Sequence, residues 1–204
     1  MAYFPFFMEL AGKKGLIVGG GPVALRKVRT LLSYGAALTV ADPEPLPQLE
    51  ALPGVRVRRE PFSPGLLEGM FFVVAASGDS GLNRRVSQLC RARGILVNAA
   101  DDREACTFLF PALVREGPLS VGVSTGGSSP SAAVWVKERL EELLPRDFGS
   151  LLEELEALRP LVKAAIPDQR RREKVFQALF LARLEAGRPL SGEEVRALTA
   201  GPRE

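Results

Sequence analysis

The sequence predicts an α/β protein that begins with a doubly wound parallel sheet and ends in a helical region. Through residues 13–100, short apolar runs alternate with amphipathic segments of helical period, which is the pattern of consecutive strand–helix–strand units. Towards the end of the chain, apolar residues recur at spacings of three and four, the period of α-helices. The 204 residues, of which 46% are hydrophobic, are enough for such a domain and a smaller partner domain.

Turn and cap residues divide the first hundred residues into elements. The first strand is expected at 16–18, an apolar run that ends in glycines. Pro22 suits the first turn of the helix that follows, and Gly35 suits its carboxyl-terminal cap. A second helix is expected from Leu82 to Gly94. The remaining strands are expected at 37–41, 55–58, 71–76 and 95–97, with the alternating run 55–58 at an edge of the sheet.

A different pattern follows the parallel sheet. Residues 107–110 and 119–123 are apolar and flank a turn at 116–118, so a pair of strands is expected there. A helix should then open at Pro130, after two serines, and end at Pro145. This segment therefore has an α+β character of its own.

The carboxyl-terminal part is expected to be mostly helical over residues 148–200, with breaks near Pro160 and Pro167. No internal repeat is present. These patterns divide the chain into three parts, which comprise residues 1–112, 113–145 and 146–204.

Composition argues against several classes of function. A net charge of +3 is too small to favour a nucleic-acid partner, and the absence of histidine leaves acid–base chemistry to other side chains. The two cysteines, Cys90 and Cys106, lack the spacing of metal ligands, so no metal site is predicted. The apolar start is interrupted by Pro5 and is too short to cross a membrane, and no later run is long enough. We expect a cytoplasmic protein without a membrane partner.

A glycine-rich loop carries the clearest functional signal. The run from Gly19 to Ala24 fits the pattern G-x-G-x-x-A between a strand and a helix, and Asp42 follows the next strand, as in Rossmann domains. Gly19 permits the tight turn, and Gly21 lets the backbone approach a pyrophosphate at the helix N-terminus. Asp42 would accept hydrogen bonds from a ribose and repel a 2′-phosphate, which favours NAD over NADP. The expected cofactor-binding residues are Gly19, Gly21, Pro22, Val23, Asp42, Pro43 and Ser77. The alternative is a glycine turn that binds nothing.

Polar residues also follow the last predicted strand of the parallel sheet. Ligands of open parallel sheets bind beyond the carboxyl ends of the strands, where Asn98 and Asp101 should lie. Asp101 is the best acid–base candidate in a chain without histidine, although a loop aspartate that caps a turn is an equally good interpretation.

Two further segments have weaker signals. The hydroxyls and glycines of 124–130 could bind an anion, but an ordinary helix cap made by Ser128 or Ser129 is the better interpretation of that segment alone. The basic run 169–174 is either a solvated helix face or a surface that gathers a polyanion.

Taken together, these motifs resemble those of precorrin-2 dehydrogenases, both stand-alone enzymes and the amino-terminal part of multifunctional siroheme synthases. The resemblance rests on an aromatic start, the glycine loop continued by Arg26 and Lys27, Asn98-Ala99-Ala100-Asp101, Phe110-Pro111-Ala112, and the run from Val123 to Pro130. It covers about residues 3–145. Residues 146–204 resemble the family only in being helical.

The resemblance implies that precorrin-2 gives up a hydride to NAD and becomes sirohydrochlorin, with Asp101 as the catalytic residue. It implies a Rossmann domain, a dimerisation segment and a helical carboxyl-terminal domain, and a homodimer built by residues 107–145. Phe108, Phe110 and Trp135 would supply apolar surface for pairing. The family also implies substrate contacts from Asn98, Ser124, Thr125 and Gly126.

Two alternatives stay open at this point. Some members of the family also insert ferrous iron into sirohydrochlorin, and the sequence does not separate this bifunctional enzyme from a dehydrogenase alone. A non-catalytic, NAD-binding regulatory module would need a partner domain or a DNA-binding helix pair, and the sequence contains no convincing one.

Overall fold

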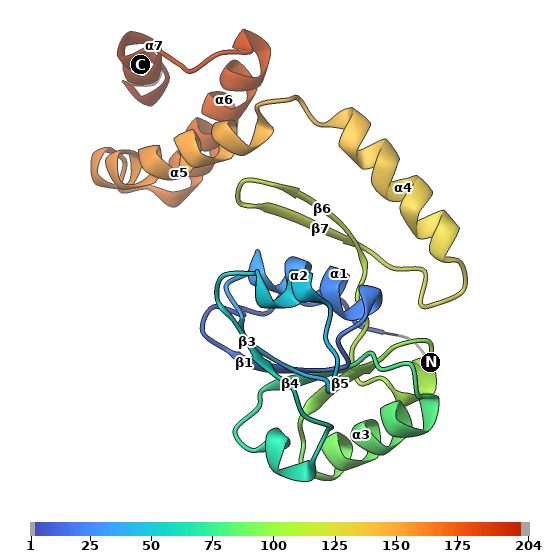
Figure 1. The fold of residues 1–204 in the computed structure, drawn as a ribbon. Helices are drawn as coiled ribbons and strands as arrows, with labels where there is room; N and C mark the ends of the chain where they lie inside the picture. The colour runs from blue at the N-terminus through green and yellow to red at the C-terminus, as the bar shows by residue number, and fades with distance from the viewer. Residues whose placement is uncertain (1–2, 201–204) are drawn as a thin grey trace. The chain divides into compact units, whose positions relative to one another are not determined.

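A computed structural model describes residues 3–200 of the chain (Figure 1). The chain divides between Phe110 and Pro111 into two compact units, and each is described by itself. None of the helices within residues 3–200 combines the length and apolar character that crossing a membrane requires.

The first unit contains a single parallel sheet of five strands in the order β3-β2-β1-β4-β5 (Figure 1). This order and the helices between the strands confirm the predicted doubly wound fold, and β3 is the edge strand that the alternating sequence indicated. The elements are β1 (Lys14–Val18), α1 (Pro22–Leu32), β2 (Ala37–Ala41), α2 (Pro47–Glu50), β3 (Val55–Arg58), η1 (Pro64–Leu67), β4 (Phe72–Ala75), α3 (Ser80–Ala92), β5 (Leu96–Ala99) and η2 (Arg103–Ala105).

The strand register brings the carboxyl ends of the central strands into line. Val18 at the end of β1 pairs with Ala41 of β2 on one side and with Ala75 of β4 on the other. Ala75 in turn pairs with Ala99 at the end of β5. The loops that follow these four strands therefore share one edge of the sheet, and the strand order reverses between β1 and β4, which is where open α/β sheets bind ligands.

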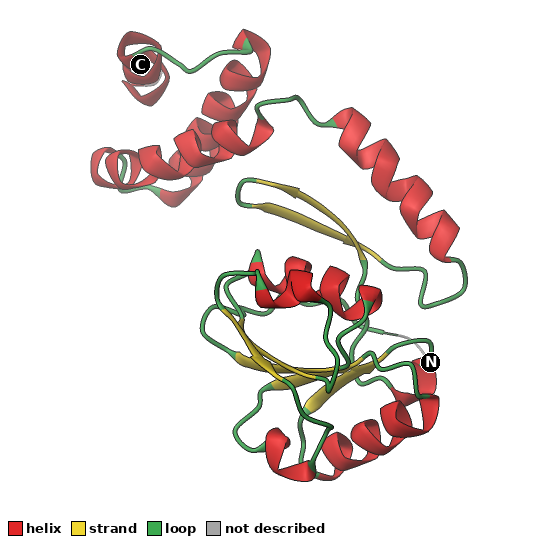
Figure 2. Ribbon diagram, viewed as in Figure 1, coloured by secondary structure: helices red, strands yellow, loops and turns green. Residues whose placement is uncertain are grey.

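Helices cover both faces of the sheet (Figure 2). Successive residues of a strand point to opposite faces, so β1 supplies both layers of the core. Leu16 belongs to the cluster that contains Val86 and Cys90 of α3, whereas Ile17 belongs to the cluster that contains Val28 of α1. Burial on both faces explains why the central strands have continuous apolar runs and no alternation.

The second unit consists of a β-hairpin followed by helices. Strands β6 and β7 are antiparallel, and Gly117 turns between them with φ 55°. The elements are β6 (Ala112–Glu116), β7 (Leu119–Val123), α4 (Pro130–Leu143), α5 (Phe148–Ala165), α6 (Gln169–Ala186) and α7 (Gly192–Ala200).

The last three helices have a small core and one buried cation. Val162 of α5 and Leu179 of α6 are fully buried in the same apolar cluster. The guanidinium of Arg183, only 2% exposed, pairs with Asp147 at 2.6 Å and with Glu154 at 2.7 Å. These two carboxylates compensate a charge that would otherwise be costly to bury.

Two predicted features are wrong. Residues 107–110 do not form the first strand of the hairpin, which lies at Ala112–Glu116. Thr107 instead bonds to the backbone of Val97 through its N–H and its side chain, and the Phe108 ring packs edge-on against Phe72. Both Phe108 and Phe110 pack on the core of the first unit, so most of the apolar surface expected from them for pairing is already used.

The helical region is also less broken than expected. The break near Pro167 is present between α5 and α6, but α5 continues through Pro160. Pro160 lies on the exposed side of α5, where water can satisfy the carbonyl that loses its partner, while Leu158 and Val162 pack on the core. The division of the chain at residues 112 and 145 stays a prediction.

Candidate functional site

The loop after β1 approaches the loop after β4 very closely. Gly19 has φ 112°, a conformation that side chains disfavour. A Cβ atom on Gly19 would lie against the carbonyl of Ala76 and 2.7 Å from the amide nitrogen of Ser77. The tight turn expected from the first glycine is therefore present, and its position leaves no room for any other residue.

Gly21 forms an open amino end for α1. It is the N-cap residue, no side chain caps the helix, and the first turn contains no acidic residue. A Cβ atom on Gly21 would meet nothing within 4 Å. The first amides of α1, which precede the bond from the Leu25 N–H to the Gly21 carbonyl, have no side-chain cap, and together with the helix dipole they suit a phosphate group. Pro22 is exposed at the first helical position, where it removes no intrahelical hydrogen bond.

The carboxylate of Asp42 is held beside this loop by backbone groups. The N–H of Gly20 donates to Oδ2 at 2.7 Å, and the N–H of Glu44 donates to Oδ1 at 2.8 Å. Both oxygens retain acceptor capacity, which two ribose hydroxyls could use. A Cβ atom on Gly20 would lie 2.6 Å from the Cα of Pro45, so Gly20 must also be a glycine for this close contact. Pro43 is exposed next to Asp42.

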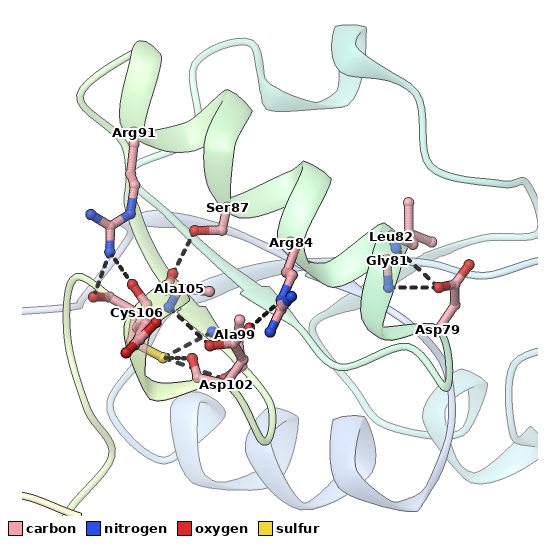
Figure 3. Close-up of polar contacts among 11 residues, drawn as sticks. Asp79, Gly81, Leu82, Arg84, Ser87, Arg91, Ala99, Asp102, Ala105 and Cys106 are labelled. Atoms are coloured by element: carbon pink, nitrogen blue, oxygen red, sulfur yellow. Dashed lines mark hydrogen bonds and ion pairs between the residues drawn. The ribbon is translucent and has the colours of Figure 1, made fainter.

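The loop after β4 is held by a residue that sequence reasoning missed. The Asn83 side chain is 4% exposed and makes reciprocal bonds with Ser77: its Oδ1 accepts from the Ser77 N–H and hydroxyl, and its Nδ2 donates to the Ser77 carbonyl. Asp79 caps α3 by accepting from Gly81 and Leu82 (Figure 3). Ser77 is therefore fixed at the sheet edge, where its role as a cofactor contact stays a prediction.

Asp101 has an unusual backbone at the same edge. It is exposed, and its φ of 60° makes it the one residue other than glycine with a positive φ in the part of the chain that the structure describes. Aspartate tolerates this conformation better than most residues, but the conformation is still a mild strain of the kind that gathers at functional sites. No hydrogen bond to its carboxylate is formed by residues 3–200, so the group is available to a ligand.

Side chains of α3 clamp the segment after Asp101 (Figure 3). The Arg84 Nε pairs with Asp102 Oδ2 at 2.7 Å, and this hydrogen bond holds the pKa of Asp102 below its usual range. The Ser87 hydroxyl donates to the carbonyl of Ala105, and Arg91 Nη2 donates to the carbonyls of Glu104 and Cys106. These bonds from α3 hold residues 102–106 in place, so Asp101 sits on a preorganised loop.

The Cys106 thiol closes this turn from inside. Its sulfur accepts from the Ala99 N–H at 3.2 Å and lies 3.2 Å from the Asp102 carbonyl, to which it can donate. Burial raises the pKa of the Cys106 thiol, which keeps it protonated as a donor. Asn98 is 7% exposed, and its Nδ2 donates to the Phe108 carbonyl at 3.0 Å. The structure thus gives Asn98 a positioning task, and its contact with substrate stays a prediction.

The turn 124–126 lies in the second unit and is organised by its own hydroxyls. The Ser124 hydroxyl accepts from the Gly126 N–H at 3.2 Å. The Thr125 hydroxyl bonds to both backbone groups of Ser129, and Ser129 caps α4 by accepting from the Ala132 N–H at 3.2 Å. The ordinary helix cap that was the better interpretation is therefore present, which leaves an anion-binding role untested.

A cavity lies away from these residues, and no metal-ligand cluster accompanies them within residues 3–200. A surface cavity of about 560 Å³ is lined by residues that precede β4 and β5, among them Glu68, Met70 and Arg93, so it lies at the opposite edge of the sheet. Within residues 3–200, no group of three or more aspartate, glutamate or cysteine side chains is arranged to hold a metal ion.

Known proteins resemble this chain over almost its whole length. Residues 6–112 match a family model described as NAD(P)-binding, and residues 116–143 match the model of the central part of sirohaem biosynthesis proteins. The siroheme synthase of Chromobacterium violaceum is 40% identical over 206 residues, which cover 97% of this chain and 42% of that protein. The siroheme synthase of Thioalkalivibrio sulfidiphilus is 41% identical over 183 residues, covering 88% of this chain and 37% of that protein. This chain thus spans less than half the length of these relatives.

A solved structure also matches closely. The structure titled "SirC, precorrin-2 dehydrogenase" superposes with a TM-score of 0.76 and is 25% identical, covering 97% of this chain and 98% of that one. The match includes both compact units, so the solved structure also contains the hairpin and the helical region.

Proposed function

Because this chain belongs to the NAD(P)-binding family whose model spans residues 6–112, and resembles a precorrin-2 dehydrogenase over 97% of its length, we propose that it oxidises precorrin-2 to sirohydrochlorin with NAD. The reaction removes one hydride and one proton from the substrate. It requires a dinucleotide site and a group that manages the proton at the same place.

The observation that carries this proposal is the shared sheet edge. The open amino end of α1, the carboxylate of Asp42 and the free carboxylate of Asp101 all follow strands whose carboxyl ends are in register. A dinucleotide bound across the switch point has its phosphates at the first glycine loop, and its nicotinamide half lies toward the strands on the β4 side. Asp101, which follows β5, is on that side.

Each residue then has a defined task. The amides that begin α1 bind the pyrophosphate, with Gly21 leaving the space free. NAD, when bound, supplies the hydride acceptor. Asp101 accepts the proton that the substrate releases, or holds the substrate in the reactive orientation, since its carboxylate has no partner among residues 3–200 and its loop is clamped. Asn98 and the turn 124–126 are proposed to contact the substrate, as the resemblance to precorrin-2 dehydrogenases implies.

NAD is proposed as the cofactor in preference to NADP. Asp42 is held next to the glycine loop by two backbone N–H groups, where it would accept from the ribose hydroxyls. A 2′-phosphate at the same position would face an uncompensated carboxylate, because the only donors bonded to Asp42 within residues 3–200 are neutral amides.

The decisive experiment is turnover by the purified chain. Precorrin-2 would be supplied by a separate methyltransferase under anaerobic conditions, and formation of NADH and of sirohydrochlorin would be followed together. Equal amounts of both products are expected with NAD. If NAD binds and precorrin-2 is not oxidised, the proposal is wrong, and a regulatory module becomes the better interpretation.

A second candidate activity is insertion of ferrous iron into sirohydrochlorin. The observation that favours it is the identity of about 40% to proteins named siroheme synthases, because siroheme contains iron. The metal ion would be a substrate, and Asp101 is the free carboxylate that could take protons from the ring nitrogens. The assay is consumption of sirohydrochlorin with ferrous or cobaltous ion, in the parent and in Asp101→Asn.

A homodimer in the cytoplasm is proposed as the working form. Helix α4 exposes Val134, Trp135 and Leu143, the last two at 58% and 77%, which is more apolar surface than one solvent-facing helix usually leaves bare. A second copy is the simplest cover for such a surface. Both cysteines are free, as in most proteins of reducing compartments.

A further inference from the structure

Lys27 is a half-buried cation on the flank of α1. Its Nζ atom lies over the ring of Phe110, 3.6 Å from the ring centroid. The Phe110 ring packs in turn against Phe108, with 5.5 Å between the centroids, and Phe108 packs against Phe72 of β4. The aromatic segment that follows the Asp101 loop therefore forms an apolar wall along the ammonium group.

The ammonium of Lys27 has no charged partner among residues 3–200. No carboxylate pairs with it and no acceptor bonds to it anywhere in residues 3–200. The charged and titratable groups that act on it are Arg26 of the same helix, which repels it, and the Cys106 thiol from the loop after β5. Burial, with Arg26 next, lowers the pKa of Lys27 to about 8. Within residues 3–200, this poorly solvated cation is compensated by an aromatic face and by the Cys106 thiol, with no carboxylate beside it.

The position of this cation matches the proposed site. Side chains of a helix lean toward its amino end, so Lys27, in the second turn of α1, reaches toward the edge where α1 begins. Cys106 and Phe110 come from the segment that the Asp101 turn opens, which puts the ammonium on the β5 side of α1. This is the side on which the substrate would meet the nicotinamide half of the cofactor.

We propose that Lys27 binds a carboxylate group of the substrate next to the Asp101 loop. The proposal rests on the proposed function, because precorrin-2 and sirohydrochlorin carry eight carboxylates each. A carboxylate on the ammonium would form a charge-assisted hydrogen bond in a place that already excludes much of the solvent, where such bonds are stronger than in water.

The pH dependence of binding follows from the charge on Lys27. The carboxylate binds the protonated form, so binding raises the pKa of Lys27 from its value of about 8. Affinity is therefore full below that pH and falls as the pH rises through about 8 to 9, where the free protein has lost the proton. A variant without the amine lacks this contribution.

The test compares Lys27→Met with Lys27→Arg and with Lys13→Met. Methionine keeps the length and apolar contacts of lysine and removes the charge, and arginine keeps the charge. Lys13 is the matched control, because its Nζ also lies over a phenylalanine ring, that of Phe71 at 5.3 Å, but at the amino edge of the sheet. Binding of sirohydrochlorin would be titrated by fluorescence quenching, and NAD binding by calorimetry.

We expect Lys27→Met to bind sirohydrochlorin about tenfold more weakly, equivalent to about 1.4 kcal/mol, with unchanged affinity for NAD. Its binding should also lose the decline between about pH 8 and 9. Lys27→Arg should retain most of the affinity, and Lys13→Met should match the parent. Thermal melting of Lys27→Met should be no lower than that of the parent, because an unpaired buried charge has been removed.

Two results would overturn the inference. One is parental affinity and parental pH dependence in Lys27→Met. The other is parental affinity with a large fall in kcat, which would make Lys27 a proton-transfer group and not a carboxylate ligand. If the parent protein itself binds NAD but no sirohydrochlorin, the proposed function and this inference both fail, and that outcome is distinguished by the parent alone.

Discussion

Gly21→Val and Gly19→Val alter the same loop but should affect different properties. The first should weaken NAD binding, and the second should lower the stability of the fold. Gly21 has φ −85° and ψ −172°, an extended conformation that valine adopts readily, and a Cβ atom there would meet nothing within 4 Å. Gly21→Val should therefore cost less than about 1 kcal/mol of folding free energy, the scale of a changed helix cap. Its side chain would occupy the space proposed for the pyrophosphate.

The expected loss of NAD affinity in Gly21→Val is much larger. Hydrogen bonds to a charged group contribute about 1.5–3 kcal/mol each. Loss of two such bonds from the first amides of α1 gives at least about 3 kcal/mol, which is more than about a hundredfold in Kd. Calorimetric titration with NAD would measure this loss, and Gly21→Ala, with its smaller side chain, should lie between the parent and the valine variant.

Gly19→Val should damage the fold instead. Valine at φ 112° is strained by about 1–3 kcal/mol. Displacement of the Ala76 and Ser77 backbone adds about 1–3 kcal/mol, as overpacked cores do. The sum of about 2–6 kcal/mol is a large part of the usual stability of about 5–15 kcal/mol, so the thermal transition of Gly19→Val should drop or disappear.

Parental NAD affinity in Gly21→Val, with a parental melting curve, would refute the placement of the pyrophosphate.

Three further predictions follow from the site. Asp101→Asn should reduce kcat for precorrin-2 about a hundredfold or more while NAD still binds. Asp102→Asn weakens one of the several bonds by which α3 holds the turn but keeps an acceptor for Ala105, so it should reduce kcat far less and leave NAD binding unchanged. Asp42 should give NAD at least a tenfold advantage in kcat/KM over NADP, about 1.4 kcal/mol, and equal values for the two cofactors would exclude the ribose contact. The chain should sediment as a dimer at micromolar concentration and Trp135→Glu should be more monomeric; a monomeric parent would remove the pairing role of α4.

The parallel sheet was predictable because its evidence is local. A strand buried on both faces, such as β1 or β4, must be apolar throughout, and glycines mark the end of β1 while Asp42 marks the end of β2. The loop of Gly19 and Gly21 was predictable for the same reason, because the spacing of its glycines is a local pattern. Of the two, Gly19 has a steric requirement within the fold that only glycine meets, whereas Gly21 leaves open space at the start of α1.

Residues whose role depends on distant partners were not predictable. The run 107–110 has the composition of a strand, but Phe108 and Phe110 serve as packing residues for the first unit. Asn83 acts through Ser77, and its only signal was a polar residue on the apolar side of α3. The environment of Lys27 depends on a ring that follows it by more than eighty residues, so no local pattern indicates its burial.

The buried Arg183 has a consequence for the order in which parts of the protein fold during synthesis. Its two carboxylate partners, Asp147 and Glu154, precede it by 36 and 29 residues, and Glu154 also accepts from the N–H of Leu190. While a ribosome is still translating α6, these carboxylates and the start of α5 have been synthesised without the cation that they surround in the finished protein. The three helices therefore gain their shared core only after α6 and α7 have been synthesised, when the first unit has had time to fold.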